Sequence, residues 1–246
     1  MKQLKVFGFA ILLLGISLFS NSAKSQEMMS NEKSLSSEEK SIVEISALAG
    51  KGDLIGLNLA LKKGLEAGLT VNQIKEVLVH LYAYSGFPRS IRGLQTFMAV
   101  LEERKAKGIT DSIGKEASPI QQEGSKYERG KKVLGELTKA PQPVALTGYS
   151  AFAPAIDVFL KEHLFADIFE RDVLSYRQRE LVTISVLSSI GGVEPMLQGH
   201  LNISLNVGLT PEQLRQFISV VKTTVGVNEA QSAQTVLDEV LKNRKL

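Results

Sequence analysis

Apolar residues recur every three or four positions along most of the chain, which is the spacing of the buried face of an α-helix. Residues 42–49 and 74–81 carry such faces, and a helix-start signal precedes each of them. Ser36 comes just before a first turn with two acidic residues, and Thr70 is followed three positions later by Gln73, which completes a capping box. No segment shows sustained alternation of apolar and polar residues, so the pattern predicts an all-α fold.

Glycine and proline mark the expected ends of these helices. Gly68 suits the left-handed position after a helix end. Pro88 disfavours helix at Phe87 and fits the first position of a new helix, which we expect to reach about Lys107. Residues 108–122 are poor in large apolar side chains and indicate a linker. Further helices are expected at residues 127–139 and 152–169.

The second half of the chain repeats the first. The segment Gly208-Leu209-Thr210 matches Gly68-Leu69-Thr70 at an offset of 140 (208 − 68). Residues 182–187 resemble residues 43–48 at an offset of 139 (182 − 43), so one residue is inserted between the two matches. Two copies of a helical unit predict tandem units packed about a pseudo-dyad. We divide the chain into a first repeat (36–107), a linker (108–126) and a second repeat (127–246).

Residues 1–26 have the order of a secretory signal peptide. Lys2 and Lys5 are followed by an uncharged apolar stretch at 6–19 and then by small residues suited to signal peptidase. The apolar stretch is shorter than the roughly 20 residues of a spanning helix, which favours cleavage over a permanent anchor. We expect an exported protein, periplasmic or secreted, that begins between Ala23 and Met28 and has no membrane attachment after cleavage.

Charge and cysteine content exclude several classes of function. Three of the 29 basic residues lie in the N-terminal segment (Lys2, Lys5 and Lys24), and without them the chain has 26 basic and 26 acidic residues, which gives no electrostatic case for nucleic-acid binding. The absence of cysteine excludes thiol catalysis and thiolate metal ligation. The three histidines lack a His-x-x-x-His spacing, so we expect no metal site.

Five stretches of the chain carry a family resemblance, at residues 76–88, 159–174, 177–183, 192–200 and 206–210. Together they resemble the carboxymuconolactone decarboxylase family, which is related to the alkylhydroperoxidase D proteins. The peroxidase branch of that superfamily carries Cys-x-x-Cys and a histidine four residues later. Here Val193 and Met196 occupy the two cysteine positions, and His200 occupies the histidine position. The resemblance therefore implies a cofactor-free decarboxylase, a lyase acting on a small carboxylate or lactone, rather than a peroxidase.

His200 and Glu180 are the first candidates for catalytic residues. Histidine supplies general acid and base chemistry near neutral pH. The alternative is a core histidine bonded to a backbone carbonyl. Glu180 lies in the family-like stretch Arg-x-Arg-Glu-Leu-Val and could exchange protons if it is buried. The alternative is a first-turn carboxylate that complements the helix dipole.

His80, in the first repeat, is the third catalytic candidate. Its counterpart in the second repeat is Val220, while the counterparts of Glu180 and His200 are Ser41 and Ala60. Each repeat has thus kept polar groups that the other lacks. One composite site, with His80 from one repeat and the Glu180 and His200 pair from the other, would explain this. Simple drift in two packed halves is the alternative.

Arg89, Arg92 and Tyr84 are the candidates for substrate binding. The two arginines follow Pro88 at a helix start, where guanidinium and free N–H groups could hold a carboxylate. Solvated surface arginines are the alternative. Tyr84 either lines a pocket or packs in the protein interior.

Two other functions stay open, namely a non-catalytic protein that binds small acids and a structural oligomer. Wide apolar faces, such as residues 184–190, and the family resemblance predict a homo-oligomer, a trimer or a dimer.

Overall fold

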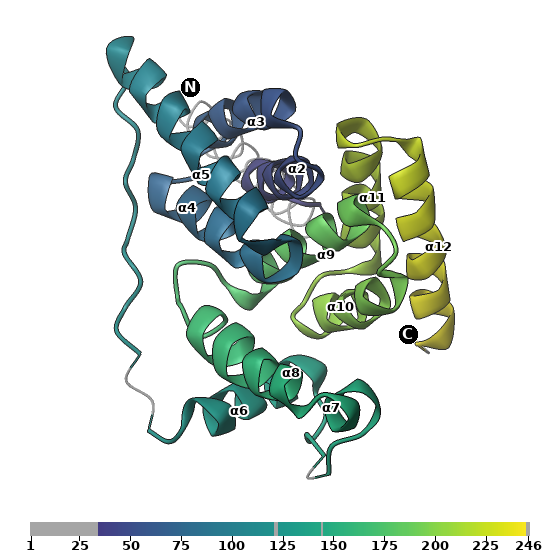
Figure 1. Cartoon of the computed structure of the whole chain (residues 1–246). Helices are drawn as coiled ribbons and strands as arrows, with labels where there is room; N and C mark the ends of the chain where they lie inside the picture. The colour runs from purple at the N-terminus through teal and green to yellow at the C-terminus, as the bar shows by residue number, and fades with distance from the viewer. Residues whose placement is uncertain (1–33, 121–122, 144, 245–246) are drawn as a thin grey trace, which may run out of the picture.

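The computed structural model describes residues 34–120, 123–143 and 145–244, so the predicted signal peptide lies outside the described residues. These residues form helices joined by turns and loops, without a strand, which confirms the predicted all-α fold (Figure 1). Among the described helices, none combines the length and the apolar character needed to cross a bilayer.

The first repeat folds into four helices: α2 (Ser37–Lys51), α3 (Leu54–Glu66), α4 (Val71–His80) and α5 (Tyr82–Ala106). Both predicted helix starts are present, because Ser36 with Glu39 and Thr70 with Gln73 form reciprocal capping boxes. Helix α4 ends at His80. The chain then bends inside α5 at Gly86, where φ is 81° and ψ is 163°, and the helix resumes at Pro88 as predicted.

Within the second repeat (127–246), four helices correspond to those of the first: α9 (Tyr176–Ile190), α10 (Glu194–Asn206), α11 (Pro211–Thr224) and α12 (Val227–Asn243). The start of α9 is offset by 139 from the start of α2 (176 − 37), and the start of α10 is offset by 140 from the start of α3 (194 − 54). The inserted residue therefore lies in the turn between α9 and α10. This helix-by-helix correspondence confirms the duplicated unit.

The two repeats share one hydrophobic core. Helix α2 packs along α9 in the middle of the molecule (Figure 1). A Cβ atom on Gly50 would lie 2.8 Å from the Oγ of Ser189, and Ser189 is the counterpart of Gly50 at the offset of these two helices. Equivalent positions of the two helices thus face each other, as expected for units related by an approximate two-fold axis. Apolar side chains from all eight of these helices, α2–α5 and α9–α12, form a continuous buried cluster around this contact.

The first part of the predicted second repeat forms a separate layer of helices, drawn below the others in Figure 1. It contains α6 (Lys126–Thr138), α7 (Gly148–Phe152), α8 (Pro154–Val158) and the π-helix η1 (Phe159–Ile168). The single helix expected at residues 152–169 is thus wrong in detail. Ala153 is extended (φ −133°, ψ 79°) because it precedes Pro154, and this breaks the helix.

Candidate functional site

The predicted site residues meet where the two repeats touch. Helices α4 and α5 of the first repeat contribute His80 and Tyr84, while α9 and α10 of the second contribute Glu180 and His200. The ring of Tyr84 lies 5.6 Å from the ring of His80 and 5.5 Å from that of His200. The structure therefore places the members of the suggested composite site in one cluster.

Glu180 and His200 form a direct pair between α9 and α10. The Nδ1 atom of His200 lies 2.9 Å from the Oε2 atom of Glu180. The Glu180 side chain is completely buried, whereas the His200 side chain is 14% exposed. The other imidazole nitrogen, Nε2, has no hydrogen-bond partner within the described part of the chain. A buried carboxylate thus orients an imidazole whose second nitrogen stays available, which is the arrangement of a general acid or base.

His80 is fully buried, and both of its ring nitrogens are engaged. The Thr183 hydroxyl donates to the backbone carbonyl of Arg179 (3.0 Å), so it accepts the hydrogen bond from His80 Nε2 (3.0 Å). His80 Nδ1 in turn accepts from Arg179 Nη1 (3.1 Å), which fixes the neutral tautomer with hydrogen on Nε2. Burial first, and then the charge of Arg179, lower the pKa of His80 well below its usual value. This arrangement favours a supporting role for His80 over proton transfer.

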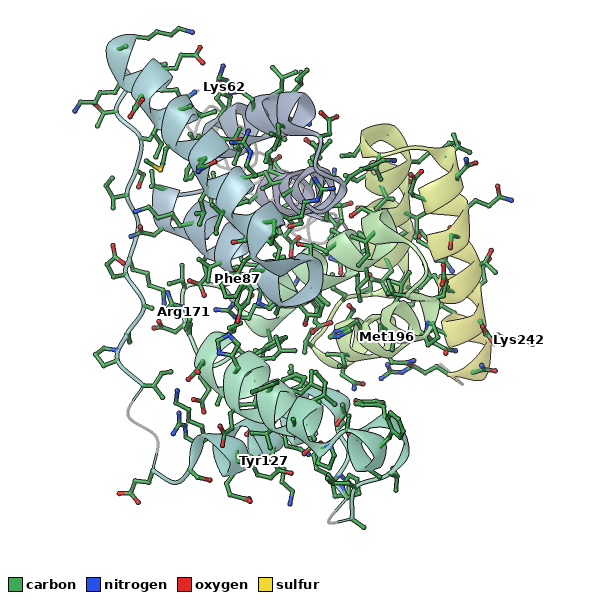
Figure 2. The ribbon with its side chains drawn as sticks, in the orientation of Figure 1. Lys62, Phe87, Tyr127, Arg171, Met196 and Lys242 are labelled. Carbon is green, nitrogen blue, oxygen red and sulfur yellow. The ribbon has the colours of Figure 1, made fainter. Side chains whose placement is uncertain are left out.

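A buried ion network supports the site, and sequence reasoning missed it. Arg179 is fully buried and donates to Glu76 Oε1 (2.7 Å) and to the carbonyl of Arg171 (2.6 Å). Arg171 also donates to Glu76 Oε2 (2.9 Å). Burial alone would raise the pKa of Glu76, but the hydrogen bonds from Arg171 and Arg179 outweigh burial and lower the pKa. Figure 2 shows Arg171 at the level where the first repeat meets the lower layer of helices.

Tyr84, whose ring contacts that of His200, lines a groove of about 400 Å³ together with Arg89 and with Gly50, Lys51, Ser85, Ser189 and Ile190. The Arg89 guanidinium lies directly against Gly52, where a Cβ atom would overlap its Nη1, and the φ of 82° at Gly52 also favours glycine. Lys51 is engaged with Glu229, so Arg89 is the cation best placed to meet an anion in the groove. Arg92 does not line this groove, because it donates to Gln95 (2.7 Å) on an exposed face of α5.

The fold and the site define an all-α protein in which two copies of one unit enclose a carboxylate–imidazole pair. The chain belongs to the carboxymuconolactone decarboxylase family, whose sequence model matches residues 23–97 and 154–239, one match in each half. It is also similar to the 4-carboxymuconolactone decarboxylase of Acinetobacter baylyi, with 27% identity over 119 residues. That match covers 48% of this chain and 88% of the relative, so about half of this chain corresponds to nearly the whole relative. This agrees with a duplicated unit.

The neutral state of His80 predicts an acid-sensitive fold. Below about pH 6.5, the usual pKa of histidine, the unfolded chain takes up a proton that folded His80 does not. The free energy of unfolding should therefore fall by at most about 1.4 kcal/mol per pH unit on this account as the pH decreases from 6.5 to 5. Urea unfolding at a series of pH values should show a smaller slope for His80→Gln than for the wild-type protein. Identical slopes would contradict a neutral His80.

Proposed function

We propose that this protein is a decarboxylase of the lyase type that acts on a small carboxylated or lactone substrate. The observation that carries the proposal is the 2.9 Å contact between Glu180 Oε2 and His200 Nδ1, with the carboxylate buried and the imidazole partly open. The counterparts of these two residues in the first repeat are Ser41 and Ala60, so the proposal assigns one site to each chain.

In the proposed reaction the bond between the substrate carbon and its carboxylate breaks, and carbon dioxide leaves without the bonding electron pair. That pair stays on the substrate as a carbanion, which takes a proton from His200 Nε2. Buried Glu180 holds the imidazole in position and stabilises its protonated form. His200 then regains a proton from solvent through its exposed edge. The net reaction consumes one proton and replaces the carboxylate with hydrogen.

Arg89 would hold an anionic group of the same substrate. Arg89 and Tyr84 both line the groove, and none of its described lining residues is acidic. A planar guanidinium binds a carboxylate through two parallel hydrogen bonds. A substrate with a second acidic group would therefore be oriented by Arg89 while its reacting carbon faces His200.

A direct assay tests the proposal. The purified protein is incubated with 4-carboxymuconolactone, the compound in the relative's name, and carbon dioxide release is followed. We expect turnover that thiol reductants do not alter and no consumption of organic peroxide with a thiol donor, because the chain lacks cysteine. Absence of turnover, combined with a raised melting temperature in small carboxylic acids, would favour a non-catalytic binding protein. Absence of both would favour a structural protein.

We also propose that the protein works after export and as a homo-oligomer. The signal-like order of residues 1–26 supports export. Large apolar side chains that are exposed in the single chain support self-association, among them Phe152 (93% exposed) and Ile55 (82% exposed).

A further inference from the structure

Buried polar atoms without a hydrogen-bond partner concentrate at the proposed site. Six such side-chain atoms occur within the described residues, and three of them are Tyr84 Oη, Glu180 Oε1 and Arg179 Nε. Burying a polar atom without a partner opposes folding, so native proteins keep few of them. Of these three residues, Tyr84 is the one that also lines the groove, so its hydroxyl is the atom that a bound ligand is best placed to complete.

The ring of Tyr84 is fixed by packing, whereas its hydroxyl lacks a well-formed hydrogen bond. Its ring packs between the imidazoles of His80 and His200, edge-on to the latter. Tyr84 lines the groove, and its hydroxyl is buried beside Thr183, within electrostatic reach of Glu180 and Arg179. The ring thus fixes where the O–H group lies, and its one such contact among the described residues, with the Thr183 hydroxyl, falls short of a well-formed hydrogen bond.

We propose that the Tyr84 hydroxyl is a catalytic hydrogen-bond donor to the substrate oxygen on which negative charge develops during decarboxylation. The inference rests on the proposed function. As the bond to the carboxylate breaks, its electron pair moves into a conjugated carbonyl of the substrate, whose oxygen becomes an enolate. Tyr84 donates a hydrogen bond to that oxygen without transferring its proton. The carbonyl re-forms when the carbon takes a proton from His200, and carbon dioxide is released.

The surroundings suit a donor that never loses its proton. Burial first, and then the neighbouring Glu180 carboxylate, raise the pKa of Tyr84 well above its usual value. The phenol therefore stays protonated and donates throughout the pH range of an assay. His80 cannot take this part, because both of its nitrogens are engaged with Arg179 and Thr183.

Tyr84→Phe tests the inference, because it removes only the hydroxyl and keeps the ring. With 4-carboxymuconolactone as the probe, we expect kcat to fall on the order of 10²–10³-fold, as for loss of one oxyanion donor, with KM little changed. The shape of the pH profile should not change. The melting temperature should stay equal or rise, because an unpartnered buried oxygen is removed. Tyr82→Phe is the matched control, since Tyr82 stacks on Phe87 and its loss of a hydroxyl should leave kcat unchanged.

Three outcomes would overturn the inference. An unchanged kcat in Tyr84→Phe, with turnover that Glu180→Gln abolishes, would remove the role of Tyr84 and leave the proposed function standing. A lowered melting temperature with unchanged kcat would show that the hydroxyl has a partner inside the protein. Absence of carbon dioxide release by the wild-type protein would remove the proposed function and this inference together.

Discussion

Replacement of His200 by alanine, or of Glu180 by glutamine, should lower kcat for carbon dioxide release by about 10²–10⁴-fold, which is the usual worth of positioned acid–base catalysis. The double variant should be little worse than either single variant. The reason is that the 2.9 Å contact makes the two residues one functional unit, and effects within a unit are not additive. Steady-state kinetics of the four proteins measure this directly.

His163→Ala is the matched control for this series. His163 is an exposed histidine on η1, paired with Asp167 across 3.2 Å, and the same substitution there should leave kcat within experimental error. Circular dichroism and thermal melting of each variant establish that it is folded. If both site variants remain folded and fully active, the chemistry lies elsewhere in the protein. If both fail to fold, the pair has a structural role.

Local signals made the helical framework predictable. The capping box of Thr70 and Gln73 marks a helix start in the first repeat. The capping box of Thr210 and Gln213 marks the corresponding helix start in the second. The helices at residues 152–169 were harder to predict, because the apolar pattern there continues through Pro154. Whether such a segment forms one helix, several helices or a π-helix depends on what it packs against. Here that partner is α6, whose Gly130 lies directly against the carbonyl of Lys161.

The candidate site was predictable in part, because histidine and a motif glutamate attract attention for their chemistry. Arg179 and Glu76 were missed although both lie in the stretches that resemble the family. Charged residues in a helix usually face solvent, and only the packing of α4 against α9 shows that these two face each other. Arg92 was expected to bind substrate together with Arg89. Three residues advance a helix by about 4.5 Å, so Arg92 lies further along α5, beyond the residues that line the groove.

Arg179→Met should be the most destabilising single substitution in the site. It leaves Glu76 buried with Arg171 as its remaining ion-pair partner, and it also removes the hydrogen bonds to His80 and to the carbonyl of Arg171. Breaking a buried ion pair from one side typically costs about 3–5 kcal/mol, because the remaining charge loses its compensation. Urea unfolding should show a lower midpoint with an unchanged slope. Arg215→Met is the control, since its pair with Glu212 is exposed and such pairs contribute about 0–1 kcal/mol.

The double variant Glu76→Met with Arg179→Met separates the loss of charge compensation from the loss of packing. With both charges replaced by apolar side chains, the buried carboxylate that Arg179 compensates is no longer present. Arg171, whose side chain is 38% exposed, can be solvated instead. The double variant should therefore be more stable than Arg179→Met alone, even though it carries one more substitution. A double variant that is less stable than the single one by the full cost of Glu76→Met would mean that the network acts through packing and not through charge. In that case the main contribution of Arg179 is its packing between α4 and α9. Arg179→Lys should then be about as destabilising as Arg179→Met, because the retained positive charge would not stabilise the protein.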